Sequence, residues 1–185
     1  MDKNKLQKLA YLFFSFGIGV IYYILVHEMG HLIVMLSAGA KITDFSVLTS
    51  HVSSTGGNYT DGSKMWMHAN GAVLPVFMSY VFMLLYQSER KRSFYRILAF
   101  ILTVLPTGSL MAWVIIPFLY AGGKAPAGDD VTNFLEIWTK YRSPYLVSAA
   151  AAFLVIAGVY ISWQRGIIPG YIDEVRALRR GEVTE

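Results

Sequence analysis

Cysteine is absent from this chain of 185 residues. The protein therefore has no disulfide framework and no thiolate metal site, and histidine, aspartate or glutamate must bind any metal ion. Charged side chains are also scarce, at 15% of the residues, whereas a soluble domain carries about 25%. Because a soluble domain of this size needs more charge to cover its surface, the composition argues against a soluble enzyme.

The chain also lacks a dense basic stripe. Its net charge is +4, but the basic residues are spread over several short loops, so we expect no nucleic-acid partner. Hydrophobic residues make up 55% of the chain and the mean hydropathy is +0.45, which excludes a disordered chain. The composition predicts a membrane protein that lies in the lipid bilayer.

Four apolar segments are long enough to cross a bilayer, which needs about 20 residues. They are Leu9–Ala40, Met65–Ser88, Ile97–Gly123 and Ser143–Gln164. The first is too long for a cleavable signal peptide and has no small-residue cleavage site. The predicted fold class is an all-α integral membrane protein with about four transmembrane helices and a short β-hairpin-like loop between the first two.

The positions of the basic residues predict an orientation. With the N-terminus inside, the inner segments hold eleven of the sixteen lysines and arginines and the outer segments hold five, so both termini are expected to be cytoplasmic. Residues 1–164 form a single polytopic membrane domain in this interpretation, and residues 165–185 form a cytoplasmic C-terminal tail. The length and the short basic N-terminus are compatible with a prokaryotic plasma membrane.

In the tail, Ile172, Val175 and Leu178 lie three apart and predict a short helix.

Two loops between these segments contain structure of their own. Residues 41–54 alternate in part between apolar and polar side chains, and Gly56-Gly57-Asn58 is a turn signal, which together predict a short hairpin beside the membrane. Its edge is available to an extended substrate strand. After Gly128, apolar residues at positions 131, 134, 135 and 138 predict a short helix capped by Asp130 or Asp129.

His27-Glu28-Met29-Gly30-His31 matches the pattern H-E-x-x-H and lies in the first apolar segment. Residues four apart share a helix face, so both imidazoles can bind one metal ion. Zinc lowers the pKa of a bound water to about 7, and Glu28 is placed to take its proton. Four histidines and six glutamates in 185 positions give about 0.003 chance matches, and an ionisable cluster inside a membrane segment is functional by default.

A catalytic zinc site has three protein ligands and one open position, so a third ligand must come from elsewhere. The candidates outside the motif are Asp44, His51, Asp61, His68, Asp129, Asp130 and Glu136. Asp130 and Asp129 both follow the third apolar segment on the outer side, near the predicted depth of the motif. Asp130 is the first choice as the third ligand, and Asp129 is the second. Either can instead cap the helix, and His68 remains a further alternative.

These residues resemble the site-2 protease family of intramembrane zinc metalloproteases. In that family the third ligand is a distant aspartate that begins a later helix, usually within the sequence Leu-Asp-Gly. Gly128-Asp129-Asp130-Val131 is similar in position but differs from that sequence. When an aliphatic or aromatic residue is aligned four positions after the ligand, Phe134 takes that position and Asp130 is favoured as the ligand. The segment 69–75 is similar to the family's small-residue motif, which implies that Asn70 orients substrate or the oxyanion. Close helix packing explains the same small residues equally well.

The resulting hypothesis is an intramembrane zinc endopeptidase that cleaves membrane-protein or peptide substrates in or near a transmembrane segment. His27, His31 and Asp130 bind Zn2+, and Glu28 is the general base. Two rival functions stay open. One is a non-catalytic membrane protein whose structural or sensory zinc site is closed by a fourth ligand such as His68 or Asp129. The other is a small transporter or proton relay.

Overall fold

The computed structural model describes residues 3–180; residues 1–2, and residues 181–185 at the end of the predicted tail, lie outside the described residues. The described chain is mostly helical and contains one antiparallel hairpin. Its elements, in order, are α1 (Lys3–Ser37), β1 (Ala40–Ser46), β2 (His51–Gly56), α2 (Asp61–Leu85), α3 (Ser93–Ala121), α4 (Asp130–Trp138), α5 (Tyr145–Gln164) and α6 (Ile167–Arg180). The predicted fold class is confirmed at this level.

Four of these helices, α1, α2, α3 and α5, are long and apolar enough to cross a membrane. They correspond to the four predicted apolar segments. Large apolar side chains such as Phe13, Phe77 and Phe153 are exposed along them, as expected for a chain whose solvent there is lipid rather than water. The four helices are therefore consistent with a multi-pass membrane protein.

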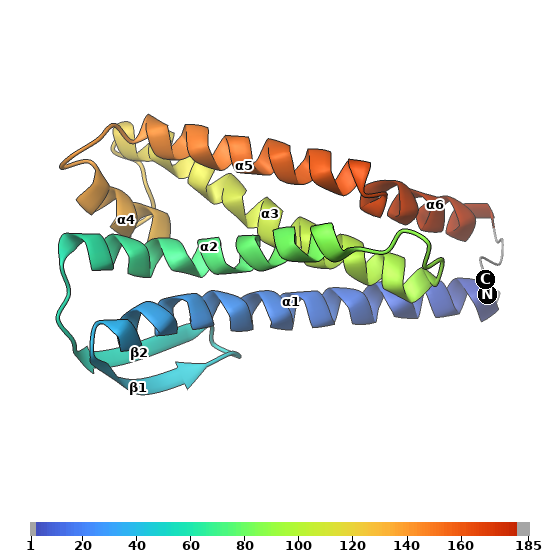
Figure 1. The fold of residues 1–185 in the computed structure, drawn as a ribbon, viewed down its shortest axis with the longest axis horizontal. Coiled ribbons are helices and arrows are strands. Elements are labelled where there is room, and N and C mark those ends of the chain that lie inside the picture. Colours follow the sequence, from blue (N-terminus) through green and yellow to red (C-terminus); the bar gives the residue numbers. More distant parts are fainter. Residues whose placement is uncertain (1–2, 181–185) are drawn as a thin grey trace.

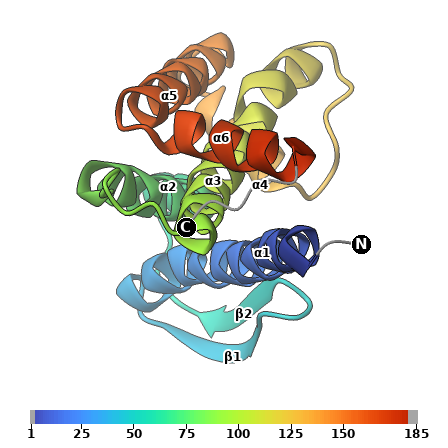
Figure 2. The same ribbon diagram turned by 90° about the vertical axis from the view of Figure 1, so that its right-hand side faces the viewer.

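Helix α3 crosses the molecule obliquely and packs on α1, α2 and α5 (Figure 1). Seen end-on, the hairpin lies against α1, and α1 separates it from the remaining helices (Figure 2). The start of α1, the α2–α3 connection and α6 meet at one end of the molecule, which we call the α6 end. The end of α1, the start of α2 and α4 meet at the opposite end, the α4 end (Figure 1).

The hairpin forms where it is predicted, but its turn lies earlier than the glycines indicate. Ala40 pairs with Gly56 and Ser46 pairs with His51, so the tight turn occupies residues 47–50. Ser50 adopts a φ of 48° in that turn, a conformation that is uncommon for a residue other than glycine. Gly56 and Gly57 instead lead the chain out of β2 toward α2.

The predicted tail begins with a helix, α6, that packs on α3 and α5. Its buried residues are Ile167, Gly170, Glu174 and Ala177 rather than the three apolar residues that predicted it. Glu174 is only 2% exposed, and its carboxylate pairs with Lys8 of α1 at 3.5 Å and with Arg96 of α3 at 3.5 Å. Buried charge pairs thus join α6 to α1 and α3.

Candidate metal centre

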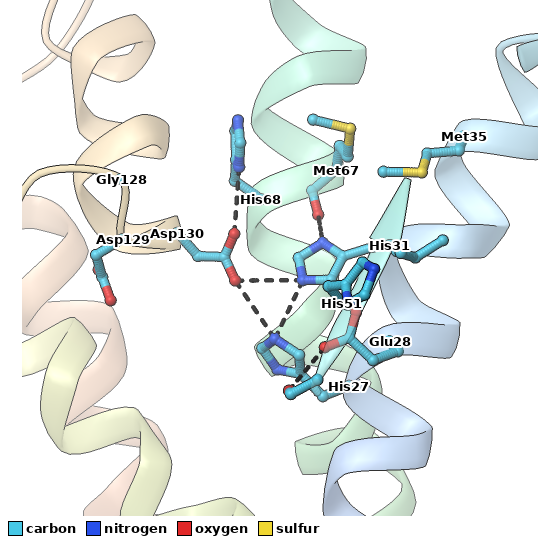
Figure 3. Close-up of a pocket in the computed structure, with 12 residues that line it drawn as sticks. His27, Glu28, His31, Met35, His51, Met67, His68, Gly128, Asp129 and Asp130 are labelled. Atoms are coloured by element: carbon cyan, nitrogen blue, oxygen red, sulfur yellow. Dashed lines mark hydrogen bonds and ion pairs between the residues drawn. The ribbon is translucent and has the colours of Figure 1, made fainter. Parts of the chain in front are cut away.

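Three side chains from two helices meet at the α4 end. His27 and His31 lie one turn apart on α1, and their Nε2 atoms are 3.1 Å from each other. Asp130 of α4 places Oδ2 at 3.4 Å from His27 Nε2 and at 3.2 Å from His31 Nε2 (Figure 3). The three ligand atoms all lie within 4.8 Å of one another, so one metal ion can reach all of them.

The start of α4 decides which of the two aspartates joins this cluster. Asp129 is the N-cap residue, and its Oδ1 accepts a hydrogen bond of 2.9 Å from the Val131 backbone N–H. Asp130 is the first helical residue, and its carboxylate faces the two histidines, whereas Asp129 points elsewhere (Figure 3). Val131 and Leu135 are buried and anchor α4 in the apolar core. The cap and the ligand are thus adjacent residues with separate tasks.

The hydrogen bonds around the cluster fit a divalent cation. His31 Nδ1 lies 2.7 Å from the Met67 carbonyl and donates to it, which leaves the lone pair of His31 on Nε2, toward Asp130. Burial raises the pKa of Asp130, but the contacts of its carboxylate with His27, His31 and His68 outweigh burial and hold that pKa well below the ordinary value. Two imidazoles and one carboxylate form a donor set that suits zinc, and a metal ion relieves the repulsion between their lone pairs.

Two glycines provide the room for this arrangement. A Cβ atom on Gly71 of α2 would lie 2.5 Å from His31 Nε2 and 2.8 Å from His27 Cε1. A Cβ atom on Gly30 of α1 would lie 2.2 Å from the Asn70 carbonyl oxygen. Since neither contact is sterically allowed, only glycine lets α1 and α2 approach this closely with both imidazoles between them.

The cluster opens onto a cavity of about 480 Å³. Its lining includes the two histidines, Glu28, His68 and Asp130, and the hairpin residues Ser50, His51 and Val52. Glu28 is 3% exposed, and its Oε1 accepts a hydrogen bond of 2.9 Å from Ser50 Oγ. The turn of the hairpin therefore covers the carboxylate that the motif predicts as general base.

The other predicted residues lie in different surroundings. Asn70 is not part of the cavity lining within residues 3–180; its amide donates a hydrogen bond of 2.8 Å to the Gly30 carbonyl. The structure thus shows the close-packing role of this segment, and a role for Asn70 toward substrate stays a prediction. His68 contacts Asp130 Oδ1 at 3.3 Å but does not belong to the group of mutually close ligand atoms.

Three contributors to the site were not predicted from the sequence. Ser50 contacts Glu28 across 22 positions, and the Met67 carbonyl accepts from His31 across 36 positions. Residue types do not reveal such contacts, because a serine in a turn and a helical carbonyl are common everywhere. For Gly71 the sequence gave one weak indication, since it is one of the small residues in the segment 69–75 that are typical of close helix packing.

Comparison with protein-family models, with curated proteins and with solved structures finds no match for this chain. The interpretation of the cluster therefore rests on the motif and on the geometry around it. The resemblance of the motif to the site-2 protease family stays a prediction.

Proposed function

We propose that the protein is an intramembrane zinc metalloendopeptidase of the site-2 protease type, which hydrolyses peptide bonds of membrane-protein substrates. The convergence of Asp130 of α4 with His27 and His31, which lie in a helix long and apolar enough to cross a membrane, carries this proposal. A carboxylate in the motif, Glu28, lines the same cavity. The three ligands, the carboxylate and the open space beside them are the parts that such hydrolysis needs.

The ligand count favours catalysis over a structural zinc site. A structural site is closed by four protein ligands, whereas a catalytic site keeps one position open. Among the described residues, the mutually close ligand atoms come from three side chains only, and His68 faces the distal oxygen of Asp130. The cluster also borders the cavity of about 480 Å³, which leaves room for water and a peptide segment.

Each polar side chain has a defined task in the proposed reaction. His27, His31 and Asp130 would hold zinc, which when bound would supply Lewis-acid chemistry toward a peptide carbonyl and a water molecule. Glu28 accepts a proton from the attacking water and then donates it to the nitrogen of the leaving amine. The C–N bond breaks, and the water oxygen remains in the new carboxyl group.

The depth of the cluster points to substrates that lie at the membrane boundary. From Lys8 at the α6 end to His27, α1 rises about 28 Å, close to the hydrocarbon thickness of about 30 Å. The basic start of α1, the basic α2–α3 connection and α6 share the α6 end (Figure 1). We therefore infer a cytoplasmic α6 end, a multi-pass location in a prokaryotic plasma membrane, and cleavage near the opposite surface.

The test compares the parent with Glu28→Gln and requires no known substrate. Both proteins are purified in detergent, loaded with zinc and incubated with solubilised membrane proteins, and the new N-termini are then identified by mass spectrometry. We expect about one zinc ion per chain in both proteins. New termini in or near transmembrane segments should arise with the parent and not with Glu28→Gln, because the variant lacks the proton acceptor.

Three outcomes would contradict parts of the proposal. Equal cleavage by Glu28→Gln would remove the assigned role of Glu28. Zinc in the parent without cleavage would support a structural or sensory site instead. A parent without zinc, prepared without chelators, would favour a transporter or proton relay, and ion flux in liposomes would then be measured.

A further inference from the structure

His68 lies beside the cluster but outside its group of close ligand atoms. Its Nδ1 is 3.3 Å from Asp130 Oδ1, on the opposite carboxylate oxygen from the one that faces His27 and His31 (Figure 3). In the Nδ1–H tautomer this imidazole donates a hydrogen bond to the carboxylate. Each oxygen of Asp130 therefore has its own set of neighbours.

Two consecutive residues of α2 fix two ligands from different helices. The Met67 carbonyl accepts from His31 of α1, and His68 contacts Asp130 of α4. Residues near the start of α2 thus set the orientation of one ligand on each side of the cluster. Outer hydrogen bonds of this kind orient metal ligands and change metal affinity by about 10- to 100-fold.

We propose that His68 is a positioning residue that holds Asp130 as a ligand through one oxygen only. A carboxylate that binds a metal through both oxygens occupies two coordination positions. His68 engages Oδ1, so Oδ2 alone is left for the metal, and the remaining position stays open for water and substrate. The inference rests on the proposed metal centre and explains why that centre stays open.

The test measures metal binding rather than cleavage. Zinc affinity is determined by competition with a chelating dye, and the coordination number is read from the visible spectrum of the Co2+-loaded protein. Four-coordinate Co2+ absorbs more strongly than five-coordinate Co2+. We expect His68→Ala to bind zinc about 10- to 100-fold more weakly and to give a weaker Co2+ spectrum, because Asp130 then binds through both oxygens.

Two further variants separate the donor from the bulk of the ring. His68→Asn places an amide N–H near the position of Nδ1, and it should restore both the affinity and the Co2+ spectrum. His51→Ala is the matched control, since His51 lines the same cavity but is paired with Asp44 on the hairpin at 2.6 Å. That control should bind zinc and Co2+ like the parent.

The outcomes distinguish this inference from the proposed function. A parent that binds neither zinc nor Co2+ would overturn both. Normal binding by the parent together with parent-like affinity and spectrum in His68→Ala would overturn the positioning role alone. Weakened binding in His68→Ala that His68→Asn does not restore, in a protein that still elutes as a single species, would also overturn it.

Discussion

Two polar clusters lie near opposite ends of α1, and they bring together different kinds of side chain. At the α6 end, the carboxylate of Glu174 is 2% exposed and pairs with the cations of Lys8 and Arg96. At the α4 end, a carboxylate and two imidazole nitrogens converge beside an open cavity. The first cluster brings together opposite charges, whereas the second brings together electron-pair donors.

This difference distinguishes a cluster that joins helices from one that we propose to bind a metal ion. Buried opposite charges attract each other, and this attraction offsets their desolvation cost when the geometry is good and further hydrogen bonds are made. Converging donors repel one another and need a proton or a metal ion to be stable. The Glu174 carboxylate at the α6 end therefore has cationic partners within the protein, and the α4 end is suited to a cation.

The largest expected effect is on stability at the α6 end. Glu174→Gln keeps the shape of the side chain but leaves the cations of Lys8 and Arg96 without their carboxylate. We expect the free energy of unfolding to fall by about 3–5 kcal/mol, measured by denaturant titration in mixed micelles, while the zinc content is unchanged. Asp173→Asn is the control, because Asp173 is an exposed neighbour on the same helix. Equal stability of Glu174→Gln and the parent would contradict a structural role for the pair.

The next effect is on metal binding at the α4 end. In Gly71→Ala the new methyl group would overlap His31 and His27, so we expect zinc affinity to fall by about 10- to 100-fold. Competition with a chelating dye measures this change. Gly17→Ala on α1 is the control, since a Cβ there meets nothing within 4 Å. Parent-like affinity in Gly71→Ala would show that the two imidazoles do not depend on this close approach.

The smallest effect concerns the hairpin turn. Ser50→Ala removes the hydroxyl that donates to Glu28, and we expect a loss of about 1 kcal/mol in the free energy of unfolding. Zinc content should stay unchanged, because Ser50 contacts none of the three ligands. Ser53→Ala on β2 is the matched control, with an exposed side chain. If the two variants have the same stability, the turn does not hold the carboxylate.

The sequence predicted the parts of this molecule that depend on local patterns. Apolar runs gave the four long helices, and the four-residue spacing placed His27 and His31 on one face. It left Asp129 and Asp130 as alternatives, because either residue type can cap a helix or bind a metal. The cap on Val131 and the contacts of Asp130 distinguish them only in three dimensions.

Long-range contacts could not be predicted in the same way. Lys8 and Arg96 counted as inner basic charges in the sequence, yet both pair with Glu174 of α6. No local pattern marks that pairing, since the three residues come from different helices. The same holds for Ser50 and Glu28, which meet only because the hairpin folds back against α1.

The most direct test of the metal centre is the zinc content of the detergent-purified protein, measured by elemental mass spectrometry beside Asp130→Ala. The account predicts about one zinc ion per chain in the parent and its loss in the variant, because two imidazoles alone hold zinc weakly. Asp129→Ala should retain zinc, since Asp129 caps α4 and is not one of the three residues whose ligand atoms lie close together. Equal zinc in the parent and Asp130→Ala would contradict the assigned ligand set, and a parent without zinc would contradict the metal centre itself.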